Sequence, residues 1–200
     1  MTLGILPKLR FSHAEHLRLL LEPSEDAQSL ITQGMSAAAF ISALDATGQT
    51  TDAIRYLAVG LPRREAIWWA CAVWRRFLPP TLPEPEAAAW QAVEAWVYEP
   101  TEANRRAAYP LAEALKFQTA GAYAALGVFW SGGSLAPPET NLVIPPGDAL
   151  TGSMVAASVI MCCVPGAAKS IGERHKAALS MGADIANGGS GQSAKELAPA

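Results

Sequence analysis

The chain has 200 residues, of which 50% are hydrophobic and 16% are charged, with a formal net charge of −3 at pH 7. This length suits one domain with a sizeable core, and the absence of a long basic run argues against binding to nucleic acid. Frequent alanine with few β-branched residues favours helix over strand. We therefore predict an all-α protein, a single-domain multi-helix orthogonal bundle.

Cysteine usage and hydropathy suggest a soluble, cytoplasmic protein. Three cysteines, two of them adjacent, form neither a disulfide framework nor a Cys-x-x-Cys zinc pattern. Two uncharged stretches, residues 117–138 and 149–168, contain too many glycine, proline and serine residues to be membrane spans. We see no secretory signal, and we expect no membrane insertion, no metal and no cofactor.

Short helices are expected in the first part of the chain. After an irregular arm, the pattern predicts helices over residues 12–21, from residue 24, over 36–46 and over 51–59. Each apolar stripe is followed by a proline or a glycine, and the helix over 51–59 ends at Gly60, which suits a C-cap.

Residues 61–77, LPRREAIWWACAVWRRF, contain three of the six tryptophans and form the predicted centre of the bundle. A helix is expected from Pro62 to about Leu78, where two prolines stop it. Its apolar arc covers more than half of the circumference and includes Trp69 and Trp74. A helix this apolar must be packed on most sides.

Trp68 departs from this pattern because it falls on the polar face of the same helix. Arg64 precedes it by four residues, so a guanidinium on the indole would contribute about 0.5–1 kcal/mol. Two readings remain open: another segment covers Trp68, or Trp68 belongs to a contact patch for a partner protein.

The sequence after the central helix predicts five more helical regions. They are a helix from Pro85 to Tyr98, a run from Thr101 that Pro110 divides or kinks, a long helix over residues 111–130, and two late helices over 151–164 and 167–187. Residues 130–148 form a long Gly/Pro-rich loop between two late helices. The helical domain is expected to span residues 1–187, followed by a disordered tail, 188–200.

Few residues suggest catalysis. His13 and His16 lack a third metal ligand nearby, and His175 would need another helix to bring it to Cys162 or Cys163. The sequence around Ser131 and Ser134 has neither a nucleophile elbow nor a P-loop ending, so turn chemistry explains its glycines. Arg105 and Arg106 are expected to be solvated, with Glu102 as an ion-pair partner. No catalytic residue is assigned.

Several motifs resemble an uncharacterised bacterial family of small helical proteins. They are LPRREAIWWAC at residues 61–71, FWSGGSLAPP at 129–138, WVYEPTEANRRAA at 96–108 and LTGSMVAASVI at 150–160. The resemblance covers residues 51–187. It implies an association with gene neighbourhoods of type VI secretion and its cargo-loading factors, and it brings no catalytic residues.

These observations lead to three hypotheses. The first is a non-enzymatic protein-binding adaptor or accessory protein, and a homo-oligomer is compatible with it. Its predicted partner-binding residues are Arg63, Arg64, Trp68, Arg75, Trp130, Leu135 and Pro137. The second is a small-molecule-binding or hydrolytic enzyme with its site under the 130–148 loop. The third is a membrane-associated helical bundle. A separate structural alternative for the LPRREA motif pairs Glu65 with Arg105.

Overall fold

The structure is a computed structural model that describes residues 3–192, and these fold as an all-helical protein, as predicted. The first half contains α1 (Ala14–Leu20), α2 (Glu25–Ser29), α3 (Ala37–Ala46), α4 (Thr50–Gly60) and α5 (Arg63–Phe77). The second half contains α6 (Glu86–Tyr98), α7 (Glu102–Ala114), α8 (Ala120–Phe129), α9 (Leu150–Cys162), the 3-10 helix η1 (Ala168–Ser170) and α10 (Ile171–Ala186). Within residues 3–192 no strand forms.

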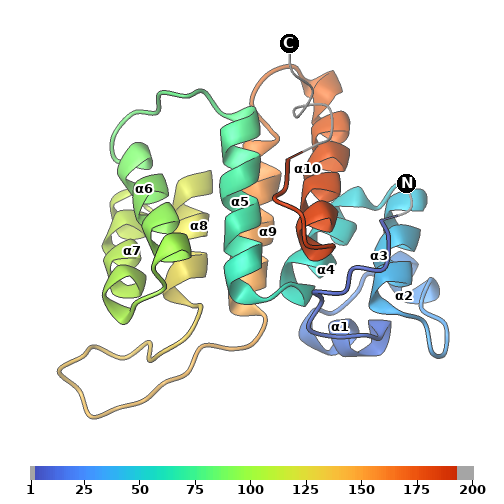
Figure 1. Cartoon of the computed structure of the whole chain (residues 1–200), viewed down its shortest axis with the longest axis horizontal. Coiled ribbons are helices and arrows are strands. Elements are labelled where there is room, and N and C mark those ends of the chain that lie inside the picture. Colours follow the sequence, from blue (N-terminus) through green and yellow to red (C-terminus); the bar gives the residue numbers. More distant parts are fainter. Residues whose placement is uncertain (1–2, 193–200) are drawn as a thin grey trace.

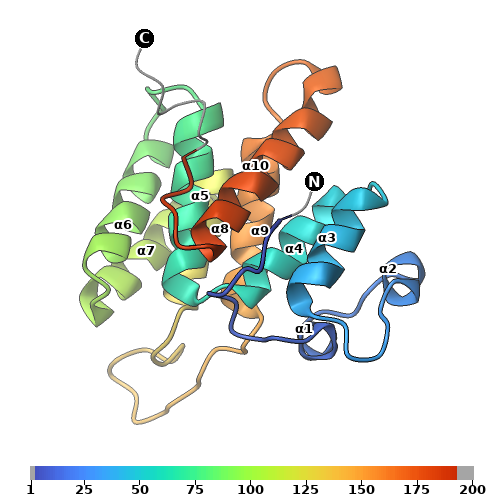
Figure 2. The same cartoon turned by 45° about the vertical axis from the view of Figure 1, so that its right-hand side comes forward.

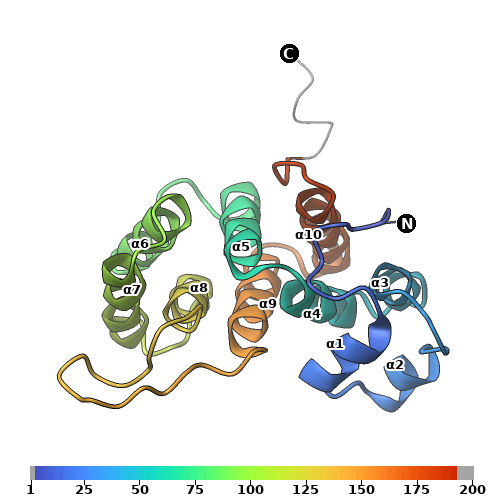
Figure 3. The same ribbon diagram turned by 60° about the horizontal axis from the view of Figure 1, so that its bottom comes forward.

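Helices α5 and α9 stand side by side at the centre of the molecule (Figures 1 and 3). Helices α6, α7 and α8 pack on one side of this pair, and α10, α4 and α3 pack on the other. The central position predicted for α5 is therefore shared with α9. The chain between α8 and α9 leaves the bundle at one end, as Figure 1 shows.

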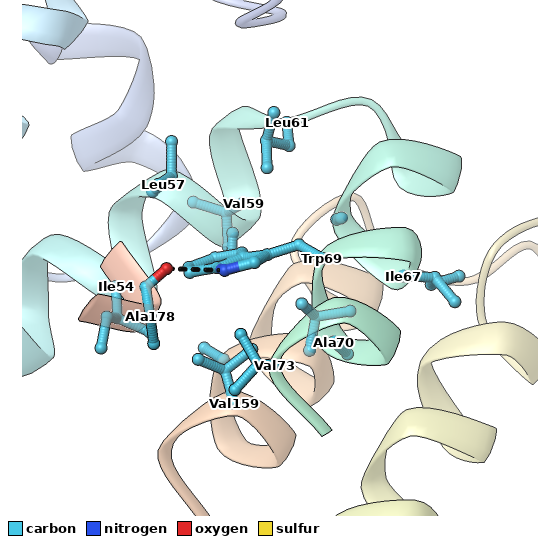
Figure 4. Packing of buried hydrophobic residues seen from close by; sticks show 14 of the residues in the cluster. Ile54, Leu57, Val59, Leu61, Ile67, Trp69, Ala70, Val73, Val159 and Ala178 are labelled. Atoms are coloured by element: carbon cyan, nitrogen blue, oxygen red, sulfur yellow. Dashed lines mark hydrogen bonds between the residues drawn. The ribbon is translucent and has the colours of Figure 1, made fainter. Parts of the chain in front are cut away.

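Trp69 is one of two fully buried tryptophans in the core, the other being Trp90. It lies among apolar residues of α4, α5 and α9, including Leu57, Val59 and Val159 (Figure 4). Its indole nitrogen donates a hydrogen bond of 2.8 Å to the carbonyl of Ala178 in α10. A buried tryptophan needs such an acceptor for its N–H, so this bond ties α10 to the centre of the bundle.

Two glycines let the central helices approach their neighbours closely. A Cβ on Gly152 of α9 would lie 2.5 Å from the Cα of Val59 in α4. A Cβ on Gly182 of α10 would lie 2.6 Å from the ring of Trp69. The close packing of the core therefore requires glycine at these two positions, in addition to the apolar side chains that fill the rest of it.

The boundary predicted at Pro110 is wrong. Helix α7 continues through Pro110 to Ala114, and the break falls at residues 115–119, where Lys116 and Phe117 adopt positive φ angles of 53° and 56°. Helix α8 begins after this turn because the Thr119 hydroxyl accepts a hydrogen bond from the Ala122 N–H. A proline inside a helix removes one backbone bond, and here the helix tolerates that loss.

Residues 188–192, which the sequence analysis assigned to the tail, turn back after α10 and run beside α5 (Figures 1 and 2). Residues 193–200 of the predicted tail lie outside the described residues. Among the helices that are described, none has the length and apolar character needed to cross a bilayer.

Candidate protein-interaction site

The loop over residues 130–149 is held to the bundle at both of its ends by one arginine. Arg63 begins α5, and its guanidinium donates to the Ser131 carbonyl at 2.9 Å and to the Asp148 carboxylate at 3.3 Å. Arg10 of the N-terminal arm lies 4.0 Å from the same carboxylate oxygen. Because one side chain contacts both the entry and the exit of the loop, Arg63 closes the loop at its base.

A second arginine holds the first part of the loop from beneath. Arg105 of α7 is 3% exposed, and its guanidinium donates to the carbonyls of Phe129 and Ser134, the latter at 3.0 Å. It also forms a two-pronged ion pair with Glu102, at 2.6 and 2.7 Å. The guanidinium lies over the Phe129 ring, 4.9 Å from its centre. The planar fork of arginine suits this combination of contacts.

Arg106 binds the next carbonyl groups along the loop. Its Nη2 donates to the carbonyls of Ser134 and Ala136, each at 3.1 Å, while its Nε donates to Glu102 at 2.6 Å. The hydrogen bonds from Arg105, with those from Arg106, lower the pKa of Glu102 to about 2. Glu102 therefore stays ionised and fixes both guanidinium groups. We call Arg63, Arg105, Arg106 and Glu102 the arginine clamp.

The loop also pairs with itself. The Leu135 N–H donates to the Ile144 carbonyl at 2.8 Å, and the Ser134 hydroxyl donates to the Leu142 carbonyl at 3.2 Å. The same hydroxyl accepts the N–H groups of Ala136 and Ile144, each at 3.1 Å. The two arms of the loop therefore lie against each other, although they form no regular strand.

The far arm of the loop exposes consecutive apolar side chains. Leu142 is 62% exposed, Val143 81% and Ile144 49%. We call these three residues the apolar tip. Single exposed apolar residues are common on protein surfaces, whereas a contiguous run on a protruding segment is typical of a contact surface.

The predicted loop residues differ in exposure. Trp130 is partly buried against the core, Leu135 is partly exposed, and Pro137 is fully on the surface. The Pro137 carbonyl accepts the N–H and the hydroxyl of Thr140, at 3.1 and 2.8 Å. Pro137 is therefore fully available to a partner, whereas Trp130 and Leu135 are available only in part.

The predicted residues on α5 divide into two groups. Arg63 faces the loop, as described above, whereas Arg64, Trp68 and Arg75 lie on the outer face of the helix. Trp68 is partly buried: its indole nitrogen donates to the Ser190 carbonyl at 3.0 Å, and its ring meets Tyr98 edge-on at 6.3 Å. The first reading is therefore met in part, because a segment crosses Trp68 without enclosing it, and a role of Trp68 in a contact patch stays a prediction.

Two expected arginine contacts are wrong. The cation over Trp68 belongs to Arg75, 5.2 Å from the ring centre, whereas Arg64 donates instead to the Val97 carbonyl at 2.7 Å. Arg75 also pairs with Glu94 of α6 at 2.6 Å. Arg105 pairs with Glu102 rather than with Glu65, and it is buried rather than solvated. The expectation that Glu102 would be the ion-pair partner is confirmed.

The Ser134 hydroxyl and the two adjacent cysteines, which were considered for catalysis, lie in settings that disfavour a nucleophile. The Ser134 hydroxyl is occupied by three contacts to the loop backbone. Burial raises the pKa of the Cys163 thiol to about 12 and raises that of Cys162 as well, which disfavours the reactive thiolate. Burial lowers the pKa of His175. Within residues 3–192, no three metal-binding side chains come together.

Arg105, Arg106 and the apolar tip were not among the predicted site residues. The spacing of Glu102 to Arg105 and Arg106, three and four residues, gave a signal for the ion pairs. No local pattern, however, shows which carbonyl groups of a distant loop the two arginines will bind.

Fold and site together define an all-helical protein that presents an arginine-clamped loop. Residues 40–186 match DUF6931, a family of unknown function, and the chain belongs to this family. No curated protein and no solved structure gives a significant match.

Proposed function

We propose that the protein is a non-enzymatic accessory or adaptor protein that binds another protein through the 130–149 loop. One observation carries this proposal: the arginine clamp fixes the base of the loop while the apolar tip remains exposed. A loop that is already ordered loses less conformational entropy on binding, so its apolar contacts contribute more to affinity.

The biological setting is also part of the proposal. The motifs at residues 61–71 and 129–138 resemble proteins associated with type VI secretion, so effector loading in that system is the proposed process. The second of these motifs supplies Ser131, Ser134 and Ala136, whose carbonyl groups the clamp binds. A cargo-loading factor needs a surface that recognises protein and needs no catalytic centre.

Binding to purified type VI secretion components, measured by biolayer interferometry with the full chain immobilised, tests the proposal. The tip variant, Leu142→Ser with Val143→Ser and Ile144→Ser, should weaken binding at least about tenfold, because each lost apolar contact costs about 1 kcal/mol or more. Leu19→Ser is the matched control, since Leu19 is 76% exposed on α1. Equal binding by the tip variant and the wild type would contradict the role of the loop.

A further inference from the structure

The 130–149 loop consists of two arms joined by a turn. Residues 134–136, which we call the inner arm, lie next to the arginine clamp, and residues 142–147, which run without a turn or bend, form the return arm. The Thr140 N–H donates to the Pro137 carbonyl at 3.1 Å in the turn between them. The return arm lies on the side of the loop away from α7 and α8 (Figures 1 and 3). Its outer edge is therefore open to another molecule.

The inner arm has both of its edges occupied. On one edge, the carbonyl groups of Ser134 and Ala136 accept hydrogen bonds from the arginine clamp. On the other edge, the Leu135 N–H donates to the Ile144 carbonyl at 2.8 Å. A partner that pairs with the backbone of this loop must therefore approach the return arm.

The return arm is paired along one edge only. The Leu142 carbonyl and both backbone groups of Ile144 bind Ser134 or Leu135. In an extended chain, successive residues direct their N–H and carbonyl groups to opposite edges. The N–H and carbonyl of Val143 therefore point away from the inner arm, and within residues 3–192 neither has a hydrogen-bond partner. Val143 is 81% exposed, so a second backbone can reach both groups.

Proline keeps this open edge short. Pro145 is the next residue to face outward, and it offers a carbonyl but no N–H. Proline on a free edge is a common means of preventing continued pairing between chains. One residue of an antiparallel segment can thus exchange two hydrogen bonds with Val143, and the side chains of Leu142 and Ile144 flank that pair.

The chemistry of the edge selects its occupant. A helix uses its own backbone groups internally, so only an extended segment can pair with Val143. The apolar tip favours apolar residues at the three facing positions. Glu139 is the only charged residue between positions 132 and 147, and it forms no ion pair within the described part of the chain. The charges of the clamp lie beyond the other edge, so a basic residue beside Glu139 completes the match.

We propose that an extended segment of the partner protein, apolar at its centre and basic at one end, adds to the outer edge of the return arm and exchanges two backbone hydrogen bonds with Val143. This inference rests on the proposed function and specifies how the same loop binds, through its backbone as well as through the apolar tip. The arginine clamp contributes by fixing the inner arm, which in turn holds the return arm in place.

The first test uses peptides and leaves the protein unchanged. The probe is fluorescein-labelled Gly-Lys-Thr-Val-Ile-Val-Thr-Lys-Gly, titrated with the full chain and followed by fluorescence anisotropy. Two further peptides each carry two N-methyl groups, either on both valines, which blocks one edge, or on the first valine and the isoleucine, which blocks both edges. The first should bind within about threefold of the probe, and the second at least about tenfold more weakly.

Two substitutions at one position test the Val143 N–H. Val143→Ala and Val143→Pro both shorten the side chain, but only proline removes the donor, so Val143→Pro should bind the probe about fivefold more weakly than Val143→Ala. Protection of the Leu135 amide from hydrogen exchange controls for an intact loop. In the wild type, a saturating amount of probe should slow exchange of the Val143 amide at least about tenfold, and this measurement decides the question if proline disturbs the loop.

Equal binding of the two methylated peptides would overturn the proposal, as would unchanged exchange at Val143 or no binding at about 1 mM probe. Equal binding of the probe by Val143→Pro and Val143→Ala would overturn it too. A concentration-dependent dimer that Val143→Pro abolishes would assign the edge to a second copy of the chain, and this would also contradict a partner segment.

Binding of the same variants to the type VI secretion components separates this inference from the proposed function. If the tip variant loses binding while Val143→Pro still matches Val143→Ala, the loop binds through its side chains alone, and only the backbone pairing is wrong. If the tip variant binds as well as the wild type, the proposed function fails, whatever the peptides show.

Discussion

The core around Trp69 and the loop over residues 130–149 are held together by different forces. The core relies on close contact between helices, where Gly152 and Gly182 leave room for backbone and ring atoms. The loop relies on arginine side chains that donate to backbone carbonyl groups across long sequence separations. We therefore expect the core to respond to changes in volume and the loop to respond to changes in hydrogen bonding.

The neighbouring tryptophans on α5 give the largest expected contrast. Trp69→Ala should lower the free energy of unfolding by about 3–5 kcal/mol, because it leaves a cavity and removes the hydrogen bond to the Ala178 carbonyl. Trp68→Ala should cost less than half as much, since Trp68 is only partly buried. Urea unfolding followed by circular dichroism measures both, and equal losses would contradict the assigned packing.

Adding a single methyl group to the core should have the next largest effect. Gly152→Ala should destabilise the protein by about 3 kcal/mol, because the new Cβ meets the backbone of Val59, which cannot move aside. Gly127→Ala is the matched control on α8, where the nearest atom to the new Cβ is 3.5 Å away, in Val155. If the two variants unfold at the same urea concentration, the close approach of α9 and α4 is wrong.

The core around Trp69 and the loop over residues 130–149 also differ in how far the sequence predicted them. The helices around Trp69 follow from apolar periodicity, and Pro79 and Pro80 marked the end of α5 to within one residue. The helix boundary predicted at Pro110 was wrong, because α7 continues through this proline and the chain turns only at Lys116 and Phe117. The clamp was missed because periodicity reports which face of a helix is apolar, not which distant carbonyl groups a buried arginine will satisfy.

Removing the arginine clamp should have an intermediate effect. Arg105→Leu should cost about 2 kcal/mol, because the carbonyl groups of Phe129 and Ser134 lose their charged donor. Arg55→Leu, which breaks an exposed pair with Asp52, should cost at most about 0.5 kcal/mol. Chemical denaturation of both variants provides the comparison. A loss for Arg105→Leu no larger than that for Arg55→Leu would show that the clamp is dispensable.

The smallest expected effect is a dependence on pH. Hydrogen bonds from Arg105 and Arg106 lower the pKa of Glu102 from 4.5 to about 2, so its contribution to stability is complete above pH 4.5 and is lost as the pH falls toward 2. The difference in stability between the wild type and Glu102→Gln should shrink over this window. A difference that stays constant from pH 6 to pH 2.5 would exclude Glu102 as the anchor of the clamp.

Hydrogen exchange at the Leu135 amide tests most directly whether the loop is held in one conformation. This N–H donates to the Ile144 carbonyl across the two arms of the loop. We expect slow exchange in the wild type, at least about tenfold slower than in an unstructured peptide, and loss of that protection in Arg105→Leu. Exchange of the wild-type Leu135 amide at the unstructured rate, with the helices still protected, would contradict a clamped loop.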